Sequence, residues 1–272
     1  MNDMTDLKLY AKQIRQKTLE LCFRKRTSHI GGSFSVADIL AVLYGKVLNI
    51  SPDTISNPNR DRLFYSKGHA SAALYSALDT KKFFCDMSLL DNFTSNDSYF
   101  TSHINHKLPG IELSTGSLGH ALGVACGSAL SGIRKNQNYS VFAVLSDGEL
   151  DEGSNWEAIL FAAHNKLDNL TMIVDFNKIQ SFGSVKDVMN LDPLADKFKA
   201  FNWDVHEVDG HNLAELDSLL SSAKISRNGK PKCIIAHTIK GRGVSFMENN
   251  LAWHYRSPNE AEFRAAQLEL EN

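Results

Sequence analysis

Two oxygen-bearing side chains, Asp147 and Asn177, each follow closely on an apolar run of the sequence, at 141–145 and 170–174. A carboxylate and an amide oxygen suit Mg²⁺ or Ca²⁺, which prefer oxygen ligands and usually share their coordination with phosphates. Either residue alone is more typical of a helix cap or a turn. The pair together predicts a divalent-metal site that also holds a phosphorylated ligand.

The two apolar runs fit buried strands that are joined by one helix-length segment. A strand, a crossover helix and a parallel strand take roughly 30 residues, and the spacing of Asp147 and Asn177 matches that length. Open α/β sheets bind ligands at the carboxyl ends of their strands. We therefore expect both side chains at the same edge of one parallel sheet.

The same alternation of strand and helix runs along the chain and predicts an α/β fold, a doubly wound, mainly parallel sheet flanked by helices. Residues 85–107 are polar and predict a loop with short helices. Ser35 is expected to cap the helix that follows it. Since no repeat, low-complexity tract or linker divides the sequence, we expect a single domain over residues 1–272. Strands are expected at 63–65, 141–145, 170–174, 203–208 and 233–237, and helices at 7–26, 36–47, 70–78, 118–133, 156–166 and 213–223.

Composition argues against several classes of protein. The chain has 272 residues, 43% hydrophobic content and a net charge of −2, so it lacks the basic excess of a nucleic-acid-binding protein. No apolar run approaches the roughly 20 residues of a membrane span. Residues 1–6 are polar and resemble no secretory signal, which predicts a cytoplasmic protein. The cysteines are far apart and mostly in apolar surroundings, so we expect reduced thiols.

Five segments, in the same order along the chain, resemble the N-terminal subunit of the split bacterial transketolases, a thiamine-diphosphate-dependent family. Ser146-Asp147-Gly148 with the later Asn177 looks like the thiamine-diphosphate motif, although Ser146 stands where glycine is usual. Residues 147–158 extend this match. A lone Asp-Gly…Asn pattern would be weak, but five collinear matches spanning nearly the whole chain are specific. The other four segments are 28–32, 60–70, 109–120 and 240–254.

The resemblance implies that the chain binds thiamine diphosphate through a divalent metal, Mg²⁺ or Ca²⁺. The protein ligands of the metal would be the side chains of Asp147 and Asn177 and the backbone carbonyl of Ile179. Gly148 would let backbone N–H groups approach a phosphate at a helix N-terminus. The further cofactor contacts that the resemblance implies are His69, Gly116, Ser117, Leu118, Glu149, Lys240 and His254.

The resemblance also implies three catalytic histidines, His29, His103 and His254. Imidazole suits proton transfer at a donor hydroxyl and an acceptor aldehyde because its pKa lies near operating pH. His103 stands in Ser-His-Ile where the family has Gly-His-Pro. His106 therefore remains an alternative to His103 as the histidine that faces the substrate channel. Tyr255 follows His254 where glycine is usual. Of the other histidines only His120 is a candidate for lying near the cofactor, and structural or surface roles are expected for His164, His206, His211 and His237.

Half of the family's active site has no counterpart in the sequence. The carboxylic acid that protonates the aminopyrimidine of the cofactor, and the arginines that bind the donor phosphate, belong to a second, pyrimidine-binding domain. The resemblance therefore implies that the partner is a separate C-terminal transketolase subunit, with two copies of each chain. Glu152 and the helix at 118–133 are the candidates for that contact. The assembled enzyme would move a two-carbon ketol unit from a ketose to an aldose.

Two alternatives remain open. The α subunit of a 2-oxo acid dehydrogenase or decarboxylase would share Asp147-Gly148-Glu149, whereas His29 and the segment 240–254 favour ketol transfer. A non-catalytic scaffold subunit is the third interpretation. Both metal ligands and His69 argue against it.

Overall fold

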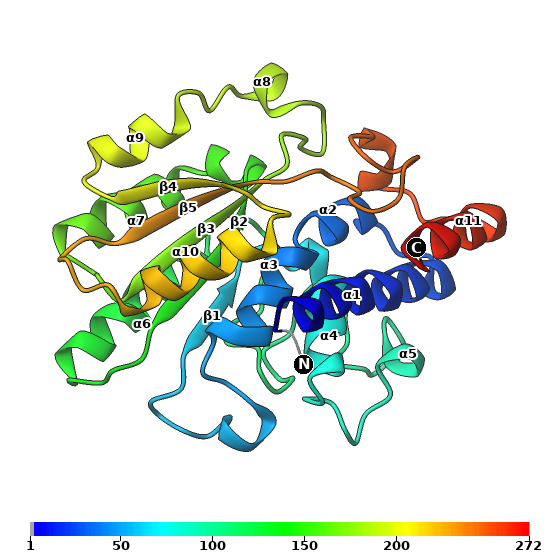
Figure 1. The fold of residues 1–272 in the computed structure, drawn as a ribbon, viewed down its shortest axis with the longest axis horizontal. Coiled ribbons are helices and arrows are strands. Elements are labelled where there is room, and N and C mark those ends of the chain that lie inside the picture. The colour runs from blue at the N-terminus through cyan, green and yellow to red at the C-terminus, as the bar shows by residue number, and fades with distance from the viewer. Residues whose placement is uncertain (1–2, 272) are drawn as a thin grey trace.

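Five parallel strands form the central sheet of the computed structural model, which describes residues 3–271. Each neighbouring pair runs parallel. The central strands β2 and β3 are buried along their whole length, as expected for strands covered on both faces. The spatial order is β1 (Arg62–Tyr65), β2 (Val141–Ser146), β3 (Leu170–Phe176), β5 (Lys232–His237) and β4 (Asp204–Asp209) (Figure 1).

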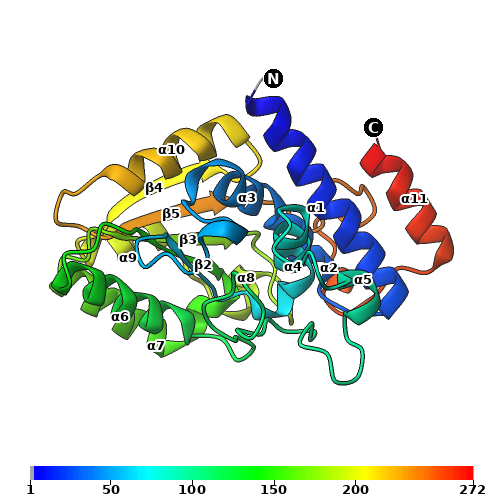
Figure 2. The ribbon, with the colours of Figure 1, turned by 90° about the horizontal axis from the view of Figure 1, so that it is seen from below.

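Helices cover both faces of this sheet, which confirms the predicted doubly wound fold (Figure 2). One face carries α1 (Asp3–Lys25), α3 (Ala37–Val42), α4 (Ser71–Thr80) and α10 (Leu213–Ile225). The other face carries α6 (Ala121–Arg134), α7 (Gly153–His164) and α9 (Leu194–Ala200).

The two layers of helices enclose two separate apolar cores. Side chains alternate between the faces of a strand, so Phe142 and Val144 of β2 enter the core with α1 and α3. Ala143 and Leu145 enter the core with α6 and α7. The sheet is therefore held from both sides, and its carboxyl edge stays open for a site.

The remaining elements are mostly short helices and single turns. The aromatic rings of Phe23 and Phe263 stack at 4.1 Å between α1 and α11. None of the helices described between residues 3 and 271 is long and apolar enough to cross a bilayer. The short helices and turns not yet named are α2 (Ile30–Ser35), α5 (Leu89–Asn92), α8 (Val185–Val188), α11 (Glu260–Glu271), a π-helical turn Leu43–Val47, and 3-10 turns Pro52–Thr54, Gly68–Ala70, Gly148–Asp151 and Leu251–His254.

Helix α1 begins at Asp3 and not at 7, and α7 begins at Gly153 and not at 156. Two other helix starts differ from the prediction because of contacts with distant parts of the chain. Ser35 does not cap a helix: it ends α2, and its hydroxyl donates to Gly32 O at 3.0 Å and to Asp175 Oδ2 at 2.6 Å. The Ser35 hydroxyl, which would accept a backbone N–H in a helix cap, instead donates to the buried carboxylate of Asp175. Helix α6 begins at Ala121 and not at 118, because Gly119 takes a φ of 84° and donates its amide to Glu149.

The core position of β3 gives a stability prediction. We expect Ile173→Ala to lower the free energy of unfolding by about 2–5 kcal/mol, because Ile173 is fully buried between β2 and β5. Ile225→Ala is the matched control, since that side chain is 78% exposed at the end of α10. Urea unfolding compares the two variants, and equal losses would contradict the core position of Ile173.

Candidate active site

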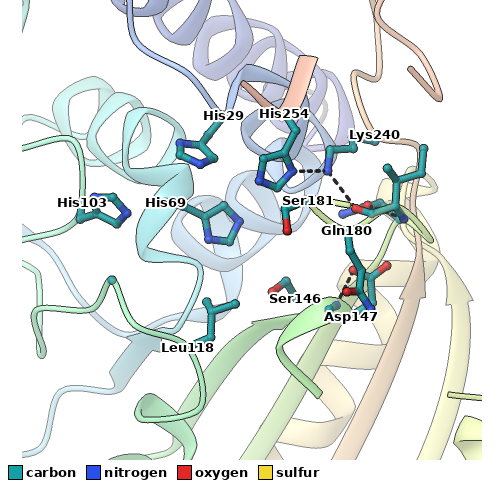
Figure 3. A pocket seen from close by; sticks show the side chains of 15 residues that line it. His29, His69, His103, Leu118, Ser146, Asp147, Gln180, Ser181, Lys240 and His254 are labelled. Carbon is teal, nitrogen blue, oxygen red and sulfur yellow. Dashed lines mark hydrogen bonds between the residues drawn. The ribbon is translucent and has the colours of Figure 1, made fainter. Parts of the chain in front are cut away.

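A cavity of about 240 Å³ opens at the carboxyl edge of the sheet, where the sequence predicts a ligand site. Its wall comes from the segments after β1, β2, β3 and β5 and from the loops around α2 and before α6. Figure 3 shows a group of histidines on one side of it and Asp147 with Lys240 on the other. The lining residues are His29, Gly32, His69, His103, Gly116, Leu118, Ser146, Asp147, Gly148, Asn177, Ile179, Gln180, Ser181, Lys240 and His254.

Asp147 and Asn177 lie together at the strand ends, as their spacing predicts. Asp147 Oδ1 accepts from Gly148 N at 2.8 Å and Oδ2 from Lys178 N at 2.5 Å. Asn177 Oδ1 accepts from Ile179 N at 3.2 Å. Asp147 is 2% exposed, and burial together with the charge of Asp175 raises the pKa of its carboxyl to about 7. A buried carboxylate held by amides and by no side-chain cation in the described residues fits a metal ligand.

Lys240 reaches the same place from the segment after β5. Its Nζ donates to Ile179 O at 2.8 Å and to His254 Nδ1 at 2.8 Å. Burial lowers the pKa of this ammonium to about 8. The carbonyl expected to bind a metal already accepts from a cation here, so a metal at Ile179 O requires Lys240 to turn away. No group of three or more His, Cys, Asp or Glu within residues 3–271 is placed to hold a metal. Asp147, Asn177 and the carbonyl of Ile179 could therefore bind one only together with ligands from another molecule, such as phosphate oxygens.

Four histidines face one another across the cavity. The ring of His29 lies 5.4 Å from that of His69, 6.1 Å from His103 and 5.1 Å from His254, between centroids. Burial, reinforced by His103, lowers the pKa of His29 to about 4. Burial and Lys240 lower that of His254 to about 3, and burial with Lys67 moves that of His69 well below its ordinary value. These three imidazoles are therefore neutral near pH 7.

The structure decides between His103 and His106. His103 lines the cavity, and its Cδ2 lies 3.3 Å from where a Cβ on Gly116 would stand. His106 is exposed, and its Nδ1 lies 2.7 Å from Ser114 Oγ. His120 is exposed as well and does not line the cavity.

Glycine is required where two wall segments touch. A Cβ on Gly68 would stand 2.3 Å from Thr115 O, closer than atoms approach. Gly68 thereby allows His69, which follows the buried strand β1, to sit against the segment that holds Gly116 and Leu118. Ser117 belongs to this segment but does not line the cavity.

Glu149 lies outside the cavity, contrary to its expected cofactor contact. Its side chain is fully buried. One carboxylate oxygen accepts from Ser66 Oγ and from Gly119 N at 3.0 Å, and the other accepts from Ser146 N at 3.2 Å. The carboxylate fixes three wall segments relative to one another and has no face left for a ligand. The side chain of Glu149 is therefore placed to support the wall and not to contact a ligand in the cavity.

Sequence reasoning missed the ion pair beneath the cavity. Lys67 Nζ pairs with Asp175 Oδ2, and both side chains are almost fully buried. Lys67 also donates to Gly32 O at 3.0 Å. Although burial raises the pKa of Asp175, Lys67 and the hydroxyls of Ser35 and Thr238 hold it below its ordinary value. The available signal was Asp175 itself, a charge inside the apolar strand β3.

Four further lining residues were not among the predicted site residues. Gly32 and Ser146 lie within segments that matched the family, whereas Gln180 and Ser181 lie outside them. Gln180 Nε2 donates to Asp151 Oδ2 at 3.0 Å, which holds Gln180 in the cavity wall. The position of Gln180 and Ser181 directly after Ile179 was the signal. His211, expected to be structural, is so: its Nδ1 lies 2.6 Å from Asp38 Oδ2, and its Nε2 accepts from Ile239 N at 2.8 Å.

A family model and curated relatives both match this chain to transketolases. A family model described as transketolase, thiamine diphosphate binding domain, matches residues 7–270. The chain is 40% identical over 267 residues to a 6-deoxy-6-sulfo-D-fructose transketolase subunit of Clostridium sp., covering 98% of this chain and 96% of that one. It is 40% identical over 269 residues to an apulose-4-phosphate transketolase subunit of Actinobacillus succinogenes, with the same coverage.

One solved structure of a longer transketolase aligns with the whole of this chain. The transketolase of Campylobacter jejuni superposes with a TM-score of 0.91 at 32% identity, and covers 100% of this chain. This chain spans only 43% of that one. The match to the two transketolase subunits, in contrast, extends over nearly their whole length.

The metal pair gives the first prediction at the site. We expect Asp147→Ala or Asn177→Ala to weaken Mg²⁺-dependent binding of thiamine diphosphate in the assembled enzyme by ~100-fold or more, because each removes an oxygen ligand. Isothermal titration calorimetry measures the affinity. Asp196→Ala, an exposed aspartate on α9, is the control. Unchanged affinity in either site variant would contradict the metal assignment.

The depressed pKa of His29 gives a prediction on stability against pH. His29 takes up a proton near pH 4 when folded and near 6.5 ordinarily. Between these values the unfolded chain binds more protons, so stability is lost as pH falls from 6.5 towards 4. His29→Asn, which tolerates the left-handed φ of 70° found there, should lose less stability over that window.

Urea unfolding at a series of pH values across this window measures the difference. His164→Asn, an exposed position on α7, controls for the loss of a histidine as such. Parallel pH profiles for the unchanged protein and His29→Asn would show that His29 titrates normally in the folded state.

Proposed function

The chain belongs to the family of transketolase thiamine-diphosphate-binding domains, and from that premise we propose that it performs the diphosphate side of a ketol transfer shared between two chains. It is a subunit of a two-chain, transketolase-type transferase. The observation that supports this most is the match over nearly the whole length of two transketolase subunits. The Campylobacter jejuni transketolase is more than twice as long as this chain, which spans 43% of it.

Anchoring the cofactor is the first task that we assign to this chain. Thiamine diphosphate, when bound, supplies the carbon that takes up the ketol unit. We propose that Asp147, Asn177 and the carbonyl of Ile179 hold a divalent metal, Mg²⁺ or Ca²⁺, on its diphosphate. Lys240 and His69 add hydrogen bonds to the phosphates. Contacts from the wall segments come from Gly116, Ser117, Leu118 and Gly148, and from His254.

Proton handling is the second task. We propose that His29, His103 and His254 accept the proton of the donor hydroxyl and return one to the product. Neutral imidazoles can accept a proton at pH 7, and the depressed pKa values of His29 and His254 keep them neutral. Lys240 donates to His254 Nδ1, so the proton of this ring lies on Nε2 and its Nδ1 becomes the acceptor when Lys240 turns to a phosphate.

The acid that the cofactor needs at its aminopyrimidine must come from elsewhere. Asp147 is the single carboxylate among the residues that line the cavity, and it lies at the metal end. The nearby Glu149 is buried behind the wall. We propose that a partner subunit with a pyrimidine-binding domain provides this acid and the arginines for a sugar phosphate.

The partner requires a surface on this chain. Apolar side chains Val124 on α6 and Leu160 and Phe161 on α7 are 45%, 59% and 43% exposed. Gly123 and Gly127 on α6 have open space beside them, so another helix can approach. We propose that α6, together with the exposed Glu152 at the start of α7, contacts the partner, and that two copies of each chain assemble.

The comparisons also bear on the other functions considered. The relatives matched over their whole length are transketolase subunits and not subunits of a 2-oxo acid dehydrogenase, so that alternative is not favoured. Those relatives are named for two different ketoses. We propose a ketose as donor and an aldose as acceptor for this chain.

One experiment tests the shared site. We expect no ketol transfer by the purified chain with thiamine diphosphate and Mg²⁺ alone, and turnover when the separate C-terminal, pyrimidine-domain subunit is added. The physical reason is that no carboxylate in the described cavity can protonate the aminopyrimidine. A coupled assay that follows consumption of the ketose measures both. Robust turnover by this chain alone would contradict the proposal.

A further inference from the structure

Tyr255 lies beside the catalytic histidines, and the proposed function gives it no task. It follows the 3-10 turn Leu251–His254 directly. The centroid of its ring lies 4.7 Å from that of His254 and 6.3 Å from that of His29. Both histidines line the cavity, and Figure 3 shows them on the side away from Asp147. Tyr255 does not line the cavity itself, but it is 60% exposed and lies against two histidines that do, so it stands on their solvent side.

The contacts of the Tyr255 side chain are to the rings of His254 and His29. The backbone amide of Tyr255 donates to Ala252 O at 3.3 Å, and among residues 3–271 its side chain is held by ring contacts rather than by hydrogen bonds. An exposed aromatic ring with a free polar tip presents an apolar face and a hydrogen-bonding group together. A sugar chain has the complementary surface, with C–H groups on one side and hydroxyls at every carbon.

The charges around Tyr255 show which part of a sugar it suits. The guanidinium of Arg256 lies 4.7 Å over the ring of Trp253, and it pairs with Glu262 at 2.6 Å. Lys240 lies deeper and donates to Ile179 O. Burial keeps His29 and His254 uncharged near pH 7, because it lowers the pKa of both. This rim therefore suits hydroxyls and carbon rather than a phosphate.

We propose that Tyr255 contacts the carbon chain of the sugar beyond the reacting carbons and sets the length of acceptor that the enzyme prefers. The inference rests on the proposed ketol transfer. Tyr255 stands on the exposed side of both rings, so the outer carbons of a sugar held between His29 and His254 can extend along it. Only a chain long enough to extend outward from the reacting carbon reaches the ring, so the contact discriminates by length.

The test uses the assembled two-chain enzyme and unphosphorylated acceptors of increasing length, namely glycolaldehyde, glyceraldehyde and erythrose. Tyr255→Ala removes the ring, and Tyr255→Phe removes only the hydroxyl. Leu251→Ala is the matched control, because Leu251 is a 39% exposed apolar side chain at the end of the same turn that is away from His254. Thermal unfolding and calorimetric affinity for thiamine diphosphate establish that each variant is folded and loaded.

We expect Tyr255→Ala to lower kcat/KM for erythrose by about tenfold, mainly through KM, and to change that for glycolaldehyde by less than about twofold. Tyr255→Phe should lose about threefold with erythrose, and Leu251→Ala should match the unchanged enzyme. Equal losses for all acceptors, no loss, or a gain with erythrose would overturn the inference and leave ketol transfer intact. Absence of ketol transfer by the unchanged assembly would instead overturn the proposed function.

Discussion

The buried ion pair between Lys67 and Asp175 is the interaction on which the arrangement of the cavity depends. It joins the segment after β1 to the middle of the sheet, and through Gly32 O and Ser35 Oγ it joins both to α2. Thr238, after β5, donates to the same carboxylate. Removing one partner of a buried pair leaves an uncompensated charge, which costs about 3–5 kcal/mol. The pair therefore fixes the four segments that present His29, His69, Asn177 and Lys240.

The same pair explains much of the electrostatics above it. Asp175 lies near Asp147 and, after burial, is the main cause of the raised pKa of that carboxyl. Lys67 in turn contributes, after burial, to keeping His69 neutral. The two ends of the cavity therefore differ in their charge. A carboxylate ready for a cation lies at one end, neutral imidazoles lie at the other, and Lys240 bridges the two through Ile179 O and His254 Nδ1.

The sheet and the convergence of Asp147 and Asn177 could be predicted because both follow from local patterns. An apolar run identifies a buried strand, and the parallel connection then places both strand ends at one edge. The contacts that were missed join residues far apart in sequence. Ser35 lies 140 positions from Asp175, and Lys67 lies 108 positions from it. Helix propensity therefore predicted Ser35 as a cap, and the motif predicted Glu149 as a cofactor contact. In the structure, both side chains instead make hydrogen bonds to residues far along the chain. The choice between His103 and His106 was out of reach because their loop has no period that separates inward from outward positions.

If this chain supplies the whole metal and diphosphate side of a shared site, a structure of the assembled enzyme with thiamine diphosphate and Mn²⁺ will show it. The anomalous signal of Mn²⁺ should lie roughly 2.0–2.3 Å from oxygens of Asp147, Asn177 and Ile179, with the remaining ligands from the cofactor. Lys240 should then have left Ile179 O for a phosphate. An anomalous peak held by residues of the partner, or a diphosphate bound away from this strand edge, would contradict the division of the site between the two chains.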